Sequence, residues 1–172
     1  MLKLAGAGMV ILSCGFLGLG VSRAYFTRPE ELRSLGTGLK MLETEIVYAA
    51  TPLPLALARV GERLSGPVAA LFTTAARVLQ ETPGVPAAQA WEQGMAALRR
   101  ESVLTPADLD ILSSLGPGLG VSGREDQVKN LELARQHLSR QLTAAVEAAN
   151  RQGKMWQTLG FLLGVALVLL MY

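Results

Sequence analysis

The stretch PEELRSLGTGLKMLETEIVYA, residues 29–49, decides the fold, because its apolar residues recur at alternating spacings of three and four. This spacing places them along one face of an α-helix, which then has a side to bury against other helices. Pro29 suits the first helical position, and Glu30 and Glu31 suit the first turn, where the helix macrodipole favours anions. The apolar row consists of Leu32, Leu35, Leu39, Leu42, Ile46 and Ala49.

The residues that follow predict four further short helices, separated by turns rich in proline and glycine. Thr51 is expected as the N-cap of the second helix and Pro52 as its first residue. Thr105 and Asp108 form a capping box that starts the fifth helix. No segment shows the alternation of a strand, so the sequence predicts an all-α fold, a helical bundle. The expected inward faces are Leu53, Leu57, Val60 and Leu64; Val68, Leu71, Phe72, Ala75, Val78 and Leu79; Ala87, Ala90, Trp91, Met95 and Leu98; and Leu109, Leu112 and Leu115.

A last helix is predicted to begin after a second capping box, formed by Ser122 and Glu125. No stop signal except Gly153 follows, so we expect the helix to run unbroken from Gly123 to Tyr172. At ~1.5 Å per residue such a helix is about 75 Å long.

Both ends of the chain are apolar enough to predict membrane spans. Residues 4–22 and residues 155–172 contain no charge, and a helix needs ~20 apolar residues to cross the hydrocarbon of a bilayer. Trp156 and Tyr172 lie where aromatic rings favour the membrane interface. The expected organisation is an N-terminal transmembrane anchor (1–27), a helical bundle domain (28–154) and a C-terminal transmembrane helix (155–172).

Three alternatives to these spans stay open. Gly20-Val21-Ser22 offers small residues at which a signal peptidase cuts, so the first span is a candidate for a cleaved signal peptide. Ile11-Leu12-Ser13-Cys14 loosely resembles a lipoprotein cleavage site, although Leu12 is bulky and the apolar run continues past Cys14. The C-terminal run also suits a buried core helix.

Basic residues around the two spans predict the side of the membrane on which the bundle lies. Positive charge favours the cytoplasmic side, and it is concentrated on the bundle side of both spans. The middle domain is therefore expected to be cytoplasmic, with short tails on the opposite side. The bundle side carries Arg23, Arg28, Arg33 and Lys40 near the first span and Arg140, Arg151 and Lys154 near the second, whereas Lys3 alone lies outside.

Composition excludes several classes of function. Of 172 residues, 50% are hydrophobic and 17% are charged, which suits a membrane protein better than a soluble one. The net charge is +2 and basic residues alternate with acids, as in Arg99-Arg100-Glu101, so no basic stripe exists to bind nucleic acid. With Cys14 as the single cysteine, neither an internal disulfide nor a thiolate metal cluster can form.

Candidate catalytic motifs are incomplete. Residues 118–123 match G-x-G-x-x-G, but a predicted helix precedes them where a dinucleotide-binding fold has a strand, and Gln141 and Leu142 follow where an acid would bind ribose. His137 is the only histidine and is expected to be exposed. Glu43 and Glu45 are two residues apart and so point in different directions on a helix. We expect no enzyme activity and no metal or cofactor.

Small residues in the predicted spans indicate helix packing in the bilayer. Gly160 and Gly164 form a small-xxx-small motif, and Gly18 lies one turn from Cys14 and Ser22 on one face of the first span. Such positions allow close approach of the other span or of partner helices. Simple tolerance of glycine in lipid explains them equally well.

Taken together, these features resemble the stage III sporulation protein AB family of endospore-forming bacteria. The likeness covers nearly the whole length, and residues 45–54 are its most specific part. It is carried by Met1-Leu2-Lys3-Leu4, Arg28-Pro29, residues 42–48 (LETEIVY), Thr51-Pro52-Leu53-Pro54, Leu115-Gly116, residues 119–122 (LGVS), Gln127 and Leu159-Gly160.

The resemblance implies a non-enzymatic membrane component of the sporulation complex that links mother cell and forespore. The family's cytoplasmic domain is similar to the helical F-domain of type II secretion and type IV pilus platform proteins. Implied partners are the complex's secretion-type ATPase and its channel-forming subunits, with the domain on the mother-cell side of the outer forespore membrane; self-association is a further expectation.

A partner surface is expected around residues 48–54 and the turn 116–123. Its candidate residues are Glu45, Tyr48, Thr51, Pro52, Leu53, Pro54, Gly120 and Ser122. Two alternatives stay open: Thr51-Pro52-Leu53-Pro54 only caps a helix, or the chain is a membrane-tethered helical adaptor or signalling scaffold unrelated to secretion.

Overall fold

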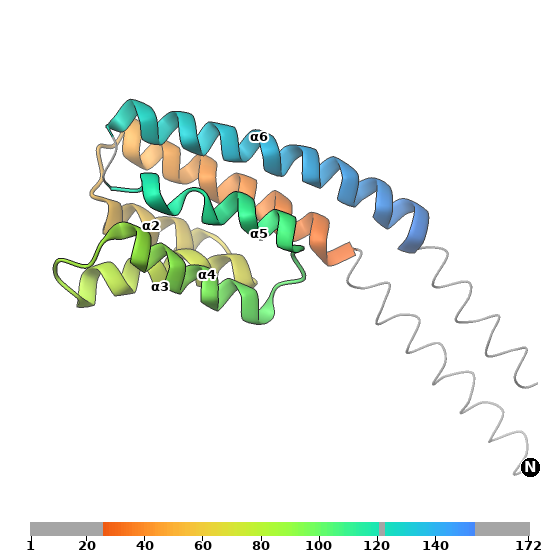
Figure 1. Ribbon diagram of the computed structural model, residues 1–172, viewed down its shortest axis with the longest axis horizontal. Coiled ribbons are helices and arrows are strands. Elements are labelled where there is room, and N and C mark those ends of the chain that lie inside the picture. Colours follow the sequence, from red (N-terminus) through yellow and green to blue (C-terminus); the bar gives the residue numbers. More distant parts are fainter. Residues whose placement is uncertain (1–25, 121–122, 154–172) are drawn as a thin grey trace, which may run out of the picture. The chain divides into compact units, whose positions relative to one another are not determined.

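The computed structural model describes residues 26–120 and 123–153, and every regular element in these ranges is helical (Figure 1). This confirms the all-α fold predicted from the sequence. A seam helix covers residues 26–47, drawn in orange. It is followed by α2 (Leu53–Arg63), α3 (Gly66–Glu81), α4 (Ala87–Glu101), α5 (Pro106–Ser113), the 3-10 turn η1 (Gly116–Gly118), α6 (Arg124–Ala148) and the π-helical turn η2 (Ala149–Gly153).

The chain divides into two compact units. The helical bundle proper is Glu30–Leu142, and residues 26–29 and 143–153 are the described part of the other unit. No helix within the described residues is both long and apolar enough to cross a bilayer. The predicted spans at 4–22 and 155–172, with Gly18, Gly160 and Gly164, lie outside the described residues.

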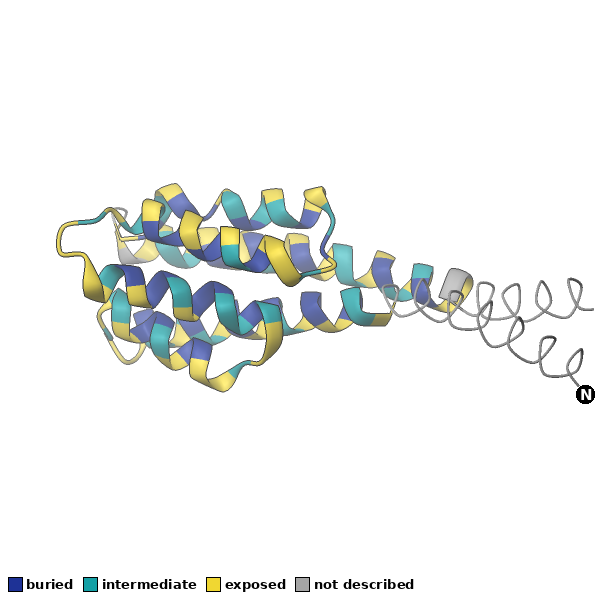
Figure 2. Cartoon of the chain, turned by 90° about the horizontal axis from the view of Figure 1, so that it is seen from below, coloured by how far each residue is buried: buried dark blue, intermediate teal, exposed yellow. Residues whose placement is uncertain are grey.

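The leucine row of the seam helix forms the centre of the core. Leu35, Leu39 and Leu42 have no exposed surface, and Leu32 and Ile46 are buried as well. Figure 2 shows how buried and exposed residues alternate along the helices. Burying a leucine side chain contributes roughly 1.5–3 kcal/mol, so this one row is a large part of the hydrophobic stabilisation. Ala49, expected to continue the row, is exposed because the helix ends at residue 47.

Glycines set how closely the helices of the bundle approach one another. A Cβ added to Gly38 of the seam helix would lie 2.9 Å from both Leu64 Cδ1 and Phe72 Cε2. Helix α3 contacts α2 on one side and α4 on the other. A Cβ at Gly61 of α2 would lie 2.5 Å from Thr73 of α3, and one at Gly94 of α4 would overlap the Leu71 carbonyl oxygen.

Two aromatic side chains complete the core. The rings of Phe72 and Trp91 pack edge to face, with centroids 5.8 Å apart and an interplanar angle of 73°. The buried Trp91 indole N–H donates to the carbonyl oxygen of Leu112 at 2.9 Å, which ties α4 to α5. The indole therefore satisfies its one polar group while filling the core.

Several predicted helix boundaries differ in the structure. The capping box of Thr105 and Asp108 is present, with the Thr105 N–H donating to Asp108 Oδ2 at 2.9 Å. Residues 26–28 are already helical, so Pro29 is not the first helical residue; its fixed φ suits a helix in any case. The last helix is continuous from Arg124 to Gly153, with π-helical bonding in place of α-helical bonding over Ala149–Gly153, and its predicted extension to Tyr172 lies outside the described residues.

Glu31 has a role that its position in the sequence did not indicate. Its side chain is buried, and Oε2 accepts the backbone N–H of Val103 at 3.1 Å, so it holds the connection between α4 and α5 against the seam helix. Burial raises the pKa of this carboxyl, and the bond from Val103 opposes the rise. Because residues 26–28 are already helical, Glu31 lies beyond the first turn, where the sequence placed it to favour the helix macrodipole.

Replacing Gly94 by alanine tests the close approach of α3 and α4. The added Cβ meets backbone, which cannot rotate away, so Gly94→Ala should lower the free energy of unfolding by about 1–3 kcal/mol. Gly36→Ala is the matched control: nothing lies within 4 Å of its Cβ position, and alanine favours a helix by roughly 0.5–1 kcal/mol. Urea denaturation of both variants should show opposite signs, and equal signs would contradict the packing described.

Candidate partner-binding site

The turn between the seam helix and α2 is held in a strained conformation. Ala50 has a φ of +49°, in the left-handed region where glycine is favoured. Beside it, the Thr51 N–H donates to the Glu45 carbonyl oxygen at 3.0 Å, which folds the chain back on the helix end. Non-glycine residues in this region cluster at binding sites, where surrounding contacts hold them in place.

The Glu45 carboxylate supplies those surrounding contacts. Its Oε2 accepts the Thr51 hydroxyl at 2.8 Å and the Arg59 guanidinium at 2.8 Å, joining the seam helix, the turn and α2. These bonds, first that from Thr51 and then that from Arg59, lower the pKa of Glu45. Thr51 is therefore not the N-cap that the sequence predicted; Pro52 occupies that position and α2 starts at Leu53.

Apolar side chains remain exposed on this turn and on the first turn of α2. Tyr48 is 81% exposed and Leu55 is 50% exposed, although both are large hydrophobic residues. Pro52 is exposed as well and lies one helical turn before Leu55. Tyr48, Pro52 and Leu55 form what we call the turn surface. Its polar neighbours Glu45 and Arg59 are bonded to one another, so the surface offers chiefly apolar contact.

The structure brings the second predicted segment next to the first. Gly120 has a φ of +77°, and a Cβ there would lie 3.1 Å from Ala87 Cβ and 3.5 Å from Leu53 Cδ2. A residue from each candidate segment therefore meets at the end of the bundle where α2 and α4 begin. Leu53 and Pro54 are half-buried in this contact region, and Ser122 lies outside the described residues.

Three residues of the site were not indicated by the sequence. Arg59 follows Glu45 by 14 residues, a separation that no local motif records. Nothing in the sequence indicated the positive φ of Ala50, because a left-handed residue after a helix is usually glycine and this one is alanine. The exposure of Leu55 could have been predicted from the sequence. Leu55 does not lie on the helix face formed by Leu53, Leu57 and Val60, so its side chain should point to solvent.

His137, Glu43 and Glu45 are placed as the sequence predicted. His137 is exposed on α6. Glu43 and Glu45 point to different partners, with Glu43 bonded to Lys40 and Arg135 and Glu45 to Thr51 and Arg59. Within the described ranges, no group of three histidine, cysteine or acidic side chains is placed to hold a metal ion.

The described residues form a small all-helical domain with exposed apolar side chains at the turn before α2. Comparisons with known proteins place it further. The family model described as stage III sporulation protein AB matches residues 3–172. Stage III sporulation protein AB of Bacillus subtilis (strain 168) is 33% identical over 171 residues, which is 99% of each chain. A solved structure of a stage III sporulation protein AB has a TM-score of 0.67 and 31% identity, and the match covers 72% of this chain and 97% of that chain.

The chain belongs to the stage III sporulation protein AB family, as the resemblance of residues 42–54 indicated. Both the family and these relatives are named as sporulation proteins.

Relief of the strained turn is a direct test of its geometry. Ala50→Gly removes the cost of a left-handed alanine and should raise the free energy of unfolding by about 1 kcal/mol. Ala49→Gly is the matched control, because its φ is not positive and glycine there only adds backbone entropy to the unfolded chain. Thermal or urea unfolding in which Ala50→Gly lost as much stability as Ala49→Gly would show that the turn is built differently.

The lowered pKa of Glu45 gives stability a defined pH dependence. An acid with a depressed folded pKa stabilises the fold above its ordinary value of 4.5, and that contribution disappears as the pH falls through the folded pKa. Glu45→Gln should therefore be less stable than the natural protein at neutral pH, and the gap should close on acidification. Glu62→Gln, at an exposed site on α2, should follow the natural protein at every pH in urea titrations. A pH-independent gap for Glu45→Gln would contradict the assignment.

Proposed function

We propose that this chain is a non-enzymatic assembly component of the sporulation complex that links mother cell and forespore. Membership of the stage III sporulation protein AB family supports a role at this stage of sporulation. The single observation that carries the proposal is Tyr48, 81% exposed on a turn fixed by the bonds of Glu45 to Thr51 and Arg59. A rigidly presented tyrosine is a frequent anchor of protein interfaces, because little side-chain entropy is lost on binding.

The proposal places the chain in a membrane through two spans, residues 4–22 and 155–172. Their uncharged composition and flanking basic residues support this placement, with the domain of residues 28–154 on the cytoplasmic side. In the sporulating cell this is the mother-cell side of the outer forespore membrane. Gly18, Gly160 and Gly164 then allow helices to pack within the bilayer.

The proposed partners are the complex's secretion-type ATPase and its channel-forming subunits. The likeness of the family's cytoplasmic domain to secretion and pilus platform domains supports this choice. The turn surface is the proposed contact, together with the supporting residues Glu45, Thr51, Leu53, Pro54, Gly120 and Ser122. The position of Gly120, where an added Cβ would lie 3.5 Å from Leu53 Cδ2, supports a surface made from both segments.

Co-purification from sporulating cells tests this function. Tyr48→Asp and Leu55→Asp, made in the tagged full-length chain, place a charge on the turn surface and should lower the yield of ATPase and channel subunits by roughly tenfold or more. Leu133→Asp is the matched control, because Leu133 is 55% exposed on α6, where it lies beside Asp110 and Ile111 of α5. Quantitative mass spectrometry of the purified material should show an unchanged yield for this control.

Two outcomes would count against the proposal. Equal yields for all three variants would remove the turn surface as the contact. A natural chain that brings down neither the ATPase nor the channel subunits would favour the alternative, a membrane-tethered adaptor or signalling scaffold unrelated to secretion.

A further inference from the structure

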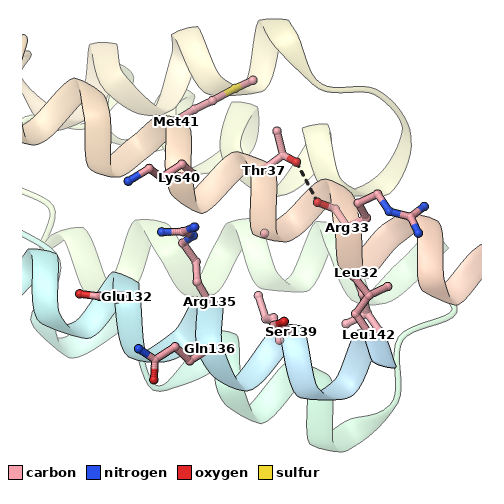
Figure 3. A pocket seen from close by; sticks show the side chains of 12 residues that line it. Leu32, Arg33, Thr37, Lys40, Met41, Glu132, Arg135, Gln136, Ser139 and Leu142 are labelled. Carbon is pink, nitrogen blue, oxygen red and sulfur yellow. Dashed lines mark hydrogen bonds between the residues drawn. The ribbon is translucent and has the colours of Figure 1, made fainter. Parts of the chain in front are cut away.

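A groove runs between the seam helix and α6, distinct from the turn surface (Figure 3). Its volume is about 720 Å³, within the range of ligand-binding clefts. Residues from 33 to 41 form one wall and residues from 132 to 142 form the other, all within the bundle unit. At ~1.5 Å per residue these walls are about 10–15 Å long. The groove is therefore elongated and follows the two helices that form its walls.

The shape of the groove suits an inserted helix. Its floor contains the buried side chains of Leu32 and Leu138, and Leu142 lies at the same end as Leu32 in Figure 3. Gly36 lies on the wall, and nothing is found within 4 Å of the place where its Cβ would be. Opposite it, Ser139 is also small. Small residues on both walls permit close approach of a third helix backbone, as in other helix-in-groove complexes.

The charges of the groove specify the chemistry of its occupant. Lys40 and Arg135 lie together, and both bond to Glu43, at 2.9 Å and 3.1 Å, so one carboxylate serves two cations. Within the part of the chain that the structure describes, the Arg33 guanidinium makes no ion pair. Glu132 is the one acidic residue on the lining. Cations thus outnumber carboxylates, and an acidic occupant is favoured.

We propose that this groove binds an amphipathic helix of a partner protein. Small or apolar residues of that helix face Gly36 and Ser139. Its acidic residues form ion pairs with Arg33 and with the two neighbouring cations, Lys40 and Arg135. The helix needs about three turns to follow the walls. This inference goes beyond the proposed function, since it adds a second contact surface and stands without the turn surface.

Site-specific photo-crosslinking in sporulating cells tests the groove. A benzophenone amino acid replaces Thr37, which is exposed on the groove wall, in the full-length chain, and the cross-linked residues are mapped by mass spectrometry. We expect cross-links to one helical segment of another protein that carries Asp or Glu at helical spacing. The same group at Lys129, exposed on α6 but not on the groove lining, is the control position and should not capture that segment.

Substitutions then separate groove binding from accidental proximity. Arg33→Glu should lower the cross-link yield by roughly tenfold, whereas Arg33→Lys should largely retain it. Gly36→Leu should abolish the cross-link by filling the groove, and a thermal melt should confirm that the bundle stays folded, because the Cβ position is open. Leu55→Asp should leave the cross-link intact, which distinguishes this inference from the proposed function.

Any of four results would overturn the groove assignment. They are capture of lipid alone, capture of a second copy of this chain, capture of a segment without acidic residues, and a yield that does not respond to Arg33→Glu or Gly36→Leu.

Discussion

The burial of one leucine row on the seam helix is the constraint on which the rest of the bundle depends. Leu35, Leu39 and Leu42 are fully buried, and Gly38 between them brings the helix against Leu64 and Phe72. Residues 124–142 of α6 lie alongside the same helix, and the ion pair of Arg135 with Glu43 joins the two helices. The seam helix therefore packs against α2 and α3 and also lies beside α6. Its position fixes where the turn surface and the groove lie.

The turn surface and the groove lie at different parts of the seam helix, the first at its C-terminal end and the second along the side that faces α6. Past residue 47 the leucine row stops, the chain turns through a left-handed Ala50, and Tyr48 is 81% exposed. Along the other wall of the helix, Gly36 lacks the side chain that would close the space beside α6. The exposed aromatic ring and the open groove are the two features on which the proposed partner contacts rest.

Much of the fold followed from local patterns, and the site followed only in part. Helical periodicity predicted the all-α architecture and most of the buried apolar side chains of the seam helix and of α2 to α5, and the capping box at Thr105 was correct, because these signals lie within a few residues of one another. The N-cap role of Thr51 was wrong, since its hydroxyl bonds to the Glu45 carboxylate, which also binds Arg59 from α2. Such pairings arise only when separate helices pack, so no sequence spacing reveals them.

Native-state hydrogen exchange on the full-length chain tests the central role of the seam helix most directly. If its leucine row organises the core, the amides of residues 35–42 exchange only through global unfolding, and their opening free energy equals that measured by denaturant. The short helix α5 (Pro106–Ser113), which has fewer buried side chains, should open at lower cost. Exchange of residues 35–42 through local opening, at or below the free energy found for α5, would contradict this organisation.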